Sequence, residues 1–297
     1  MISLVKIVGI GDAAIDYYYR CDRWPKVGDK AMVNLIKSEL GGMISNAIAN
    51  LGKYGAEAYL VDEIYEGHKE FIESTLLNFN VKKDCLTYTK ENITTTTNIM
   101  LTKDERTIFI NWSKKPRNLT EVQLELIKTA DCIYTTISDL KMLCNVDEAI
   151  MHADFNGKIV LDLENNTFES FAQDKKYFDL ADIIFINDHA LEKLQCEIKV
   201  QEIISGKEKI IVLTEGKNGC EVITSEKSEK IEGIKVSVVD TTGAGDMFNS
   251  TYVYALFSGK DPFESARIAN YAAAKSVECM GNKNIDLINE VRKIIIR

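Results

Sequence analysis

A glycine-rich turn that ends in an aspartate lies in the stretch VVDTTGAGDMFNS, residues 238–250 of this 297-residue chain. Glycine lets the backbone approach a ligand closely and adopt positive φ angles. The N–H groups at the start of a helix have no partner inside the helix, so they can bind an anion. Asp246 adds a carboxylate at the mouth of this anion site. The pattern suits phosphoryl transfer to an alcohol, because the N–H groups offset charge on the moving group while the aspartate accepts the hydroxyl proton.

Two simpler interpretations explain part of this run. Aspartate is a good helix N-cap and glycine is common in turns, but these preferences account for one acid and one glycine rather than for all of residues 240–246. A Walker-type phosphate loop would need a lysine where Asp246 stands. We therefore prefer an anion hole with a general base beside it.

Alternating strands and helices are expected to position the turn. Short apolar runs rich in β-branched residues recur along the chain, with amphipathic segments such as residues 120–130 between them. Strands that are buried on both faces of a parallel sheet are apolar throughout, as these runs are. The alternation predicts an α/β fold with a mainly parallel sheet sandwiched by helices. The runs span residues 4–8, 132–137, 159–163, 183–186 and 210–213.

The sequence around the glycine turn predicts a strand, the turn and then a helix. Val236, Val238 and Val239 favour a strand before the turn. Residues 247–257 are apolar enough for a buried helix after it. This context would place the turn at the edge of the sheet.

Two regions interrupt the alternation of strands and helices. Residues 15–21 alternate with period two, and residues 33–38 are again strand-like. Residues 94–102 and 106–112 predict a hairpin around Lys103-Asp104-Glu105. No helices separate the strands within either region, so we expect a small accessory sheet that rises from the main body.

Composition and charge bear on possible partners and location. The formal net charge is −9 and there is no basic block, which argues against duplex nucleic acid as a partner. The sequence contains no run of about 18 apolar residues, which a membrane-spanning helix would need, and its N-terminus lacks the pattern of a secretory signal. The seven cysteines are scattered without a C-x-x-C pair, as in a reduced, cytoplasmic protein.

A second glycine motif, near the N-terminus, has another explanation. Gly9 to Ala14 fits the loose dinucleotide fingerprint G-x-G-x-x-A, and Asp29 follows at a plausible distance. That fingerprint needs a helix directly after the glycines to hold a pyrophosphate. The chain instead continues with the alternating stretch IDYYYRCDRWP, which favours a strand and argues against a dehydrogenase.

Residues 240–246, DTTGAGD, match the signature D-T-x-G-A-G-D of the ribokinase-like (PfkB-type) carbohydrate kinases, which this chain resembles over most of its length. The resemblance implies one ribokinase-like domain over residues 1–297, whose β-sheet lid comes from about 15–40 and 94–112. It implies ATP-dependent phosphorylation of a sugar at a primary hydroxyl, with ATP and Mg²⁺ as cofactors and a possible homodimer through the lid. Asp246 would be the catalytic base, and the anion hole would consist of Gly243, Ala244 and Gly245.

The acceptor side of the implied site comes from the N-terminal part of the chain. Residues 41–47 resemble the family signature G-G-x-x-x-N-x-A, and the apolar spacing of residues 44–54 predicts a helix opened by two glycines. Asp16 matches the aspartate that binds substrate hydroxyls in the family. A carboxylate next to an amide suits a polyol ring. The implied substrate-binding residues are Asp16, Gly41, Gly42 and Asn46, although Gly41-Gly42 alone also fits a plain turn.

The nucleotide side of the implied site comes from the C-terminal half. Residues 214–219 resemble the loop T-x-G-x-x-G, and Asn187 stands where the family begins its N-x-x-E motif. The resemblance places the adenine near the helix with Asn270 and Ala273, and a monovalent cation such as K⁺ at Asp240 and Thr242. The implied nucleotide-binding residues are Asn187, Thr214, Gly216, Gly219, Thr242 and Asn270.

Several positions depart from the family pattern and keep other functions open. Ala190 stands in place of the N-x-x-E glutamate, and residues 61–67 differ from the usual G-D-D-x-x-G run. Ala14 and Met43 stand where ribokinase itself has asparagine and lysine. One alternative is a kinase of the same fold that acts on a nucleoside or a vitamin-like alcohol. Another is a sugar- or nucleotide-binding regulator that has lost turnover, against which the intact Asp246 argues.

Overall fold

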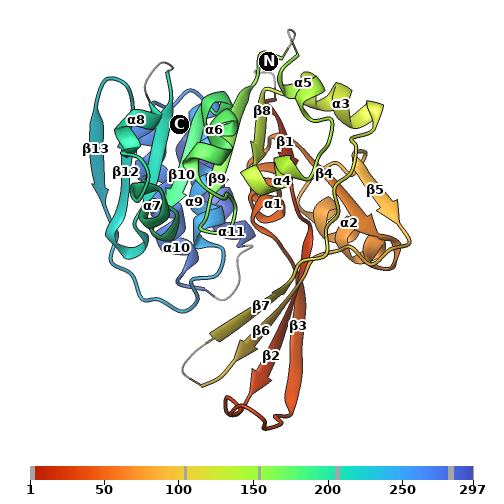
Figure 1. The fold of residues 1–297 in the computed structure, drawn as a ribbon. Coiled ribbons are helices and arrows are strands. Elements are labelled where there is room, and N and C mark those ends of the chain that lie inside the picture. The colour runs from red at the N-terminus through yellow and green to blue at the C-terminus, as the bar shows by residue number, and fades with distance from the viewer. Residues whose placement is uncertain (1–3, 104–105, 153–154, 205–207, 280–283, 297) are drawn as a thin grey trace.

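The computed structural model describes residues 4–103, 106–152, 155–204, 208–279 and 284–296. Its main element is a nine-stranded sheet, in which the strands from β11 to β5 pair in parallel while β12 and β13 add an antiparallel edge (Figure 1). The order is β13 (Ser228–Glu232), β12 (Gly219–Ile223), β11 (Ile210–Thr214), β10 (Ile183–Asn187), β9 (Lys158–Leu163), β8 (Cys132–Thr135), β1 (Lys6–Ile10), β4 (Glu57–Tyr65) and β5 (Leu86–Thr89).

Helices cover both faces of this sheet, because successive strand residues point to opposite sides and both sides are apolar. In β1, Ile7 belongs to one buried cluster while Val8 and Ile10 belong to the other. The first cluster includes residues of α1 (Met43–Tyr54), α2 (Lys69–Asn78), α9 (Ala244–Phe257), α10 (Pro262–Ser276) and α11 (Ile285–Ile296). The second includes residues of α3 (Glu121–Lys128), α4 (Ile137–Lys141), α5 (Asp147–Ile150), α6 (Phe171–Leu180), α7 (Asp188–Gln195) and α8 (Val200–Ile203).

A second sheet of four strands, here called the lid, projects from the main body (Figure 1). In it β2 pairs antiparallel with β3 and parallel with β6, and β6 pairs antiparallel with β7. The predicted hairpin between residues 94 and 112 therefore forms, although residues 104–105 of its turn lie outside the described residues. The lid order is β3 (Val33–Gly41), β2 (Ala14–Cys21), β6 (Thr96–Leu101) and β7 (Arg106–Asn111).

The predicted fold class is confirmed, while one predicted strand is wrong. Residues 233–239 form no strand, and Val238 and Val239 are largely exposed at 63% and 60%. The backbone N–H groups of Val239 and Asp240 instead donate to the carbonyl of Val277, at 2.7 and 3.1 Å. Residues 239–240 thus pair with the C-terminal end of α10 and not with a strand. The β-branched residues of this segment are therefore not part of a sheet.

Two other local predictions agree with the structure. The glycines at residues 9–11 lead into β2 and not into a helix, so the argument against the dinucleotide fingerprint is confirmed. The helix predicted at residues 247–257 forms, but it begins earlier, at Ala244. The glycine turn is therefore the first turn of α9 and not a loop before it. None of the helices in the described part of the chain is long and apolar enough to cross a membrane.

Candidate active site

The N-terminus of α9 brings the two signature regions into contact. Gly243 is its N-cap and has a left-handed backbone, with φ of 72°, and Asp246 lies in its first turn. The side-chain amide of Asn46, on α1, donates to Oδ2 of Asp246 at 2.8 Å, although the two residues are 200 positions apart. The predicted base therefore adjoins a predicted acceptor-binding residue.

Buried polar contacts fix α9 against α1. The Asn50 amide donates to Oγ of Ser250 at 3.3 Å, and Ser250 in turn donates to the carbonyl of Asp246 at 2.6 Å. One turn further along, the hydroxyls of Tyr54 and Thr251 hydrogen-bond at 2.7 Å. Hydrogen bonds have directional geometry, so these contacts set how far α9 can slide along α1, and with it the position of Asp246.

A third set of contacts attaches α9 to the sheet. Asp162, near the end of β9, accepts hydrogen bonds from the Tyr134 hydroxyl at 2.6 Å and from the Asn249 amide at 2.9 Å. Burial raises the pKa of Asp162, while these two donors favour its charged form. No sequence motif indicated these contacts, since Tyr134, Asp162 and Asn249 lie on three separate elements.

Glycine is required sterically at both residues that precede α1. A Cβ added to Gly41 would lie 2.2–2.3 Å from the carboxyl atoms of Asp16, which is itself buried. Gly42 has φ of 93°, and its added Cβ would lie 2.3 Å from the carbonyl oxygen of Asp12. Both positions exclude a side chain, so the pair is more than a plain turn, and it leaves space for the Asp16 carboxylate next to the start of α1.

A buried lysine connects the end of the lid with the main sheet. Lys114, just after β7, forms ion pairs with Oδ1 of Asp12 at 3.1 Å and with Asp62. Asp12 also accepts a hydrogen bond from Thr95 at 2.6 Å. Asp62 belongs to residues 61–67, the run that departs from the family pattern, and in the structure it forms an ion pair with Lys114. Nearby, burial and then the charge of Asp12 raise the pKa of Asp139 to about 8.

A cavity of about 900 Å³ opens beside the first turn of α9, at the carboxyl ends of β10 and β11. Ligands of open α/β sheets bind at this edge, and the volume lies in the range of small-molecule sites. Thr241 lines it, whereas the predicted Thr242 is not among its lining residues. Of the predicted site residues it is lined by Asn187, Thr214, Gly216, Gly219, Ala244, Gly245 and Asn270.

Three glycines line this cavity together with apolar side chains such as Val236 and Phe248. Added Cβ atoms on Gly216 and Gly245 would meet nothing within 4 Å, so both residues leave open space there. Gly219 has φ of 97°, and its added Cβ would lie 2.0 Å from the carbonyl oxygen of Ile231. Asn270 helps to close the cavity, since its amide donates to the carbonyl of Glu232 at 2.9 Å.

The start of α7 explains one departure from the family pattern. Asn187 is the N-cap of this helix, and its Oδ1 accepts the N–H of Ala190 at 2.9 Å. Ala190 has no exposed surface and belongs to the apolar core. A glutamate at this position would place an ionised group in apolar surroundings, which is costly.

An arginine from the lid reaches the glycine turn. Arg106, the first residue of β7, donates to Oγ1 of Thr242 and, at 3.3 Å, to Oγ1 of Thr241. Its guanidinium also lies 3.6 Å from Oδ1 of Asp240. The pair Asp240 and Thr242, predicted to hold a monovalent cation, is thus in contact with a cationic side chain. Nothing in the local sequence indicated Arg106 as a site residue.

The hydroxyl of Tyr18, in the lid, also lies close enough to Asp240 and Arg106 to interact with their charges. Burial raises the pKa of Tyr18, on β2, and the carboxylates of Asp16, Glu39 and Asp240 raise it further. Tyr18 therefore lies among carboxylates of the lid itself and near Asp240 of the main body.

The residues present fit a nucleotide with its metal ion. The cavity is glycine-lined and ends at the N-terminus of α9, where phosphates bind readily. The described residues contain no cluster of three or more His, Cys, Asp or Glu side chains that could hold a metal ion. Mg²⁺ in phosphoryl-transfer sites typically uses one or two carboxylates together with phosphates and water, so such a site needs no cluster of this kind.

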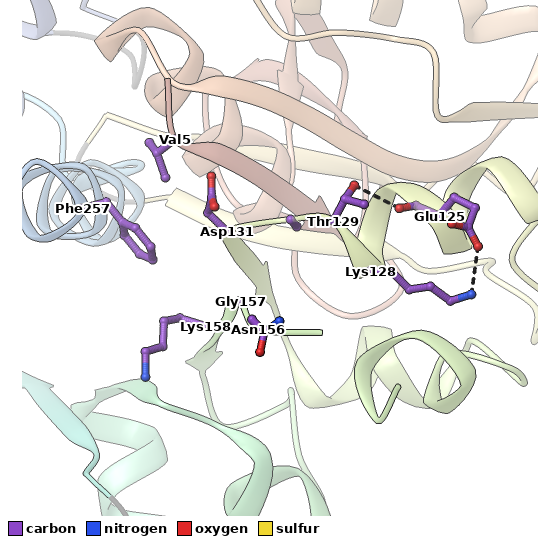
Figure 2. A pocket seen from close by; sticks show the side chains of 10 residues that line it. Val5, Glu125, Lys128, Thr129, Asp131, Asn156, Gly157, Lys158 and Phe257 are labelled. Atoms are coloured by element: carbon purple, nitrogen blue, oxygen red, sulfur yellow. Dashed lines mark hydrogen bonds and ion pairs between the residues drawn. The ribbon is translucent and has the colours of Figure 1, made fainter. Parts of the chain in front are cut away.

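A second cavity, of about 740 Å³, lies at the opposite edge of the sheet (Figure 2). Its lining includes Asp131 and Lys158, next to the amino ends of β8 and β9. Glu125 and Lys128, from α3, are hydrogen-bonded to one another at 2.9 Å. None of the predicted site residues lines this cavity, so it is separate from the candidate active site.

Comparisons with known proteins agree with this arrangement. The profile of the "pfkB family carbohydrate kinase" family matches residues 5–288. A ribokinase of Bacillus subtilis is 25% identical over 96% of this chain and 98% of its own length. A nucleoside kinase of Methanothermobacter thermautotrophicus is 23% identical over 93% and 91%, respectively.

Solved structures show the same fold. The nucleoside kinase of Methanocaldococcus jannaschii superposes with a TM-score of 0.80 at 19% identity, over 98% of this chain and 99% of that one. The Arabidopsis thaliana ribokinase complexed with ribose and ATP has a TM-score of 0.79 at 22% identity, with the same coverage. The relatives include kinases of both sugars and nucleosides. Because the family profile covers nearly the whole chain, this chain belongs to the PfkB family of carbohydrate kinases.

Proposed function

We propose that this chain transfers the γ-phosphoryl group of ATP to a primary hydroxyl of a sugar, with Asp246 as the general base. The observation that carries the proposal is the hydrogen bond of 2.8 Å between the Asn46 amide and the Asp246 carboxylate. This contact supports the proposal because Asp246 would then lie between the acceptor elements and the nucleotide cavity. Gly245 lines that cavity directly before Asp246 in the chain.

The residues divide the chemistry between them. Asp246 accepts the proton of the acceptor hydroxyl as its oxygen bonds to phosphorus and the bond to the leaving ADP oxygen breaks. The backbone N–H groups of Gly243, Ala244 and Gly245 offset the charge on the moving group. Bound ATP would supply the phosphoryl group, and Mg²⁺ would offset negative charge on its phosphates.

The acceptor side favours a polyol. The Asp16 carboxylate can accept two hydroxyl hydrogens, and the Asn46 amide can both donate and accept. Asp16 is a buried residue of the lid strand β2, next to a glycine that leaves space for it. We therefore favour a furanose or a related open sugar, with the hydroxyl nearest Asp246 as the acceptor.

A nucleoside is the second candidate, because the same lid face is partly apolar. In the register of the lid, Asp16 pairs with Thr97 and Thr97 pairs with Ile110, so these side chains share one face. Ile110 and its neighbour on that face, Ile108, are 58% and 46% exposed. A flat base could cover them, and nucleoside kinases are among the relatives of this chain.

The outer face of the lid suits a homodimer. Trp24 and Phe109 stack with ring centroids 5.9 Å apart, yet 47% and 49% of their surfaces are exposed. Leu35 is 56% exposed. We expect a dimer in sedimentation velocity and a monomer for Phe109→Lys; a wild-type monomer would contradict this part of the proposal.

The remaining assignments are also proposals. Residues 1–297 would act as one kinase domain in the cytoplasm, where the seven free cysteines stay reduced. A monovalent cation such as K⁺ would have to share Asp240 with the guanidinium of Arg106. Activity in sodium, potassium and tetramethylammonium salts distinguishes a cation-dependent enzyme from an independent one.

An acceptor screen tests the proposed function. The protein is incubated with ATP, Mg²⁺ and single members of a panel of sugars and nucleosides, and ADP release is measured for each. We expect acceptor-dependent ADP release with one or a few sugars. Turnover with nucleosides alone would replace the sugar by the second candidate, and no acceptor-dependent release with any member would contradict the kinase.

A further inference from the structure

The side chain of Arg106 spans the gap between the lid and the main body. It belongs to β7, a lid strand, and its contacts are with Thr241 and Thr242 of the glycine turn and with Asp240. About 38% of the Arg106 side chain is exposed, so water reaches the guanidinium. An ion pair between groups that water reaches is weak, and its geometry can be exchanged readily.

The guanidinium lies beside the glycine turn that is proposed as the anion hole. Thr242 directly precedes Gly243, the N-cap of α9. Ala244 and Gly245 line the nucleotide cavity, and Asp246 contacts the acceptor side through Asn46. A cation at Thr242 therefore borders the path from the cavity to the base.

The chemistry of the contact favours a phosphate over its present partners. Two of the contacts are to neutral threonine hydroxyls, and a planar guanidinium binds phosphate oxygens more strongly through charge-assisted, bidentate hydrogen bonds. Positive charge at the transferring group lowers the barrier, because negative charge is spread over its oxygens in the transition state.

The lid also connects Arg106 with acceptor binding. Along β2, Asp16 and Arg20 point to the same face, since side chains alternate. Arg20 pairs with Leu101, and Leu101 pairs with Arg106, so Arg106 shares the face that carries Asp16. An acceptor that binds Asp16 and fixes the position of this face would therefore also fix the position of Arg106.

We propose that Arg106 is a catalytic residue that binds the transferred phosphoryl group when the lid closes over the acceptor. This inference rests on the proposed kinase function. It implies that the lid supplies part of the phosphoryl-transfer site and does more than cover the acceptor.

Steady-state kinetics of Arg106→Gln, with the acceptor found in the screen, test this proposal. We expect kcat at saturating ATP and acceptor to fall about 10²- to 10³-fold, as when one donor to a developing charge is lost. Arg106→Lys should recover part of the loss because it keeps the charge. Guanidinium chloride at low millimolar concentration should partly restore kcat of Arg106→Ala. The matched control is Arg20→Gln, in the same lid register, which should keep kcat.

A purely structural role for Arg106 gives a different pattern. If it only held the lid in place, Arg106→Gln would raise the acceptor KM, leave kcat unchanged, and Arg106→Ala would not respond to guanidinium. That result would overturn this inference while an active wild type still supported the kinase. A wild type without acceptor-dependent ADP release would overturn the proposed function, and this inference with it.

Discussion

The nucleotide side and the acceptor side of the site are built from different parts of the chain. The nucleotide cavity is lined by glycines, by the ends of β10 and β11 and by apolar side chains, and its glycines leave backbone open to a ligand. The acceptor side depends on side chains from separate segments, among them Asp16 on β2 and Asn46 on α1. Lys114 and Arg106 reach the site from either end of β7.

This difference indicates which half can vary between relatives. A backbone surface accepts one ligand and is lost when a Cβ intrudes, whereas a side-chain surface can be changed residue by residue without changing the fold. Ala190 departs from the family pattern on the nucleotide side, at the start of α7, whereas Ala14 and Met43 depart from it on the acceptor side, where they begin β2 and α1. We expect substitutions there to change the acceptor, and substitutions at the glycines to change nucleotide binding.

The largest expected effect comes from the acceptor side. Asp16→Ala removes the carboxylate that would bind substrate hydroxyls, and a site built for a hydroxyl loses up to about 10⁴-fold in kcat/KM without that contact. ATP affinity, measured by calorimetry, should hardly change. The matched control is Glu39→Gln, a neighbouring lid carboxylate paired with Lys37. An unchanged acceptor KM for Asp16→Ala would remove Asp16 from the site.

The next effect tests the backbone surface. An added Cβ at Gly245 meets nothing within 4 Å, so Gly245→Ala should fold normally and weaken ATP binding moderately. Gly245→Val fills more of the cavity and should raise the ATP Kd by about 10²-fold or more, equivalent to about 3 kcal/mol. Calorimetric titration with ATP measures both. Equal ATP affinity in all three proteins would show that the nucleotide binds elsewhere.

A substitution at Lys114 tests whether ion pairs on the acceptor side also contribute to the free energy of unfolding. Lys114→Met removes the cation that pairs with the half-buried Asp12 and the buried Asp62, and removal of one partner of a buried ion pair typically costs about 3–5 kcal/mol. Urea unfolding should show this loss, and the double variant Lys114→Met/Asp62→Asn should recover part of it. A loss below about 1 kcal/mol would mean that these charges are not desolvated in solution.

A further prediction concerns the pH dependence of stability. The pKa of Asp139 is raised to about 8 by burial and by Asp12, so the folded protein keeps a proton that the unfolded chain releases near its ordinary pKa. The free energy of unfolding should therefore fall as pH rises from about 4 to about 8, and level off above that range. Asp139→Asn should flatten this part of the profile in urea titrations. An identical slope in both proteins would contradict the raised pKa.

The sequence predicted best the features that depend on local backbone chemistry. The DTTGAGD run predicted the turn at Gly243 and the aspartate after it. The spacing between Gly41-Gly42 and Asn46 predicted the start of α1. Residues 236–239 were predicted wrongly as a strand, because β-branched composition does not tell whether a partner strand is available. Arg106 and Lys114 carry no local signal. Their roles depend on how the lid meets the main body, which only the folded chain shows.

Asp246→Asn tests the central claim most directly, because it keeps the shape of the side chain and removes its basicity. The measurement is kcat at saturating ATP and acceptor, together with the ATP Kd of the same protein. Loss of a positioned base typically costs about 10²–10⁴ in rate, so kcat should fall by that order while the ATP Kd changes little. Near-normal turnover of Asp246→Asn on the true acceptor would contradict the mechanism.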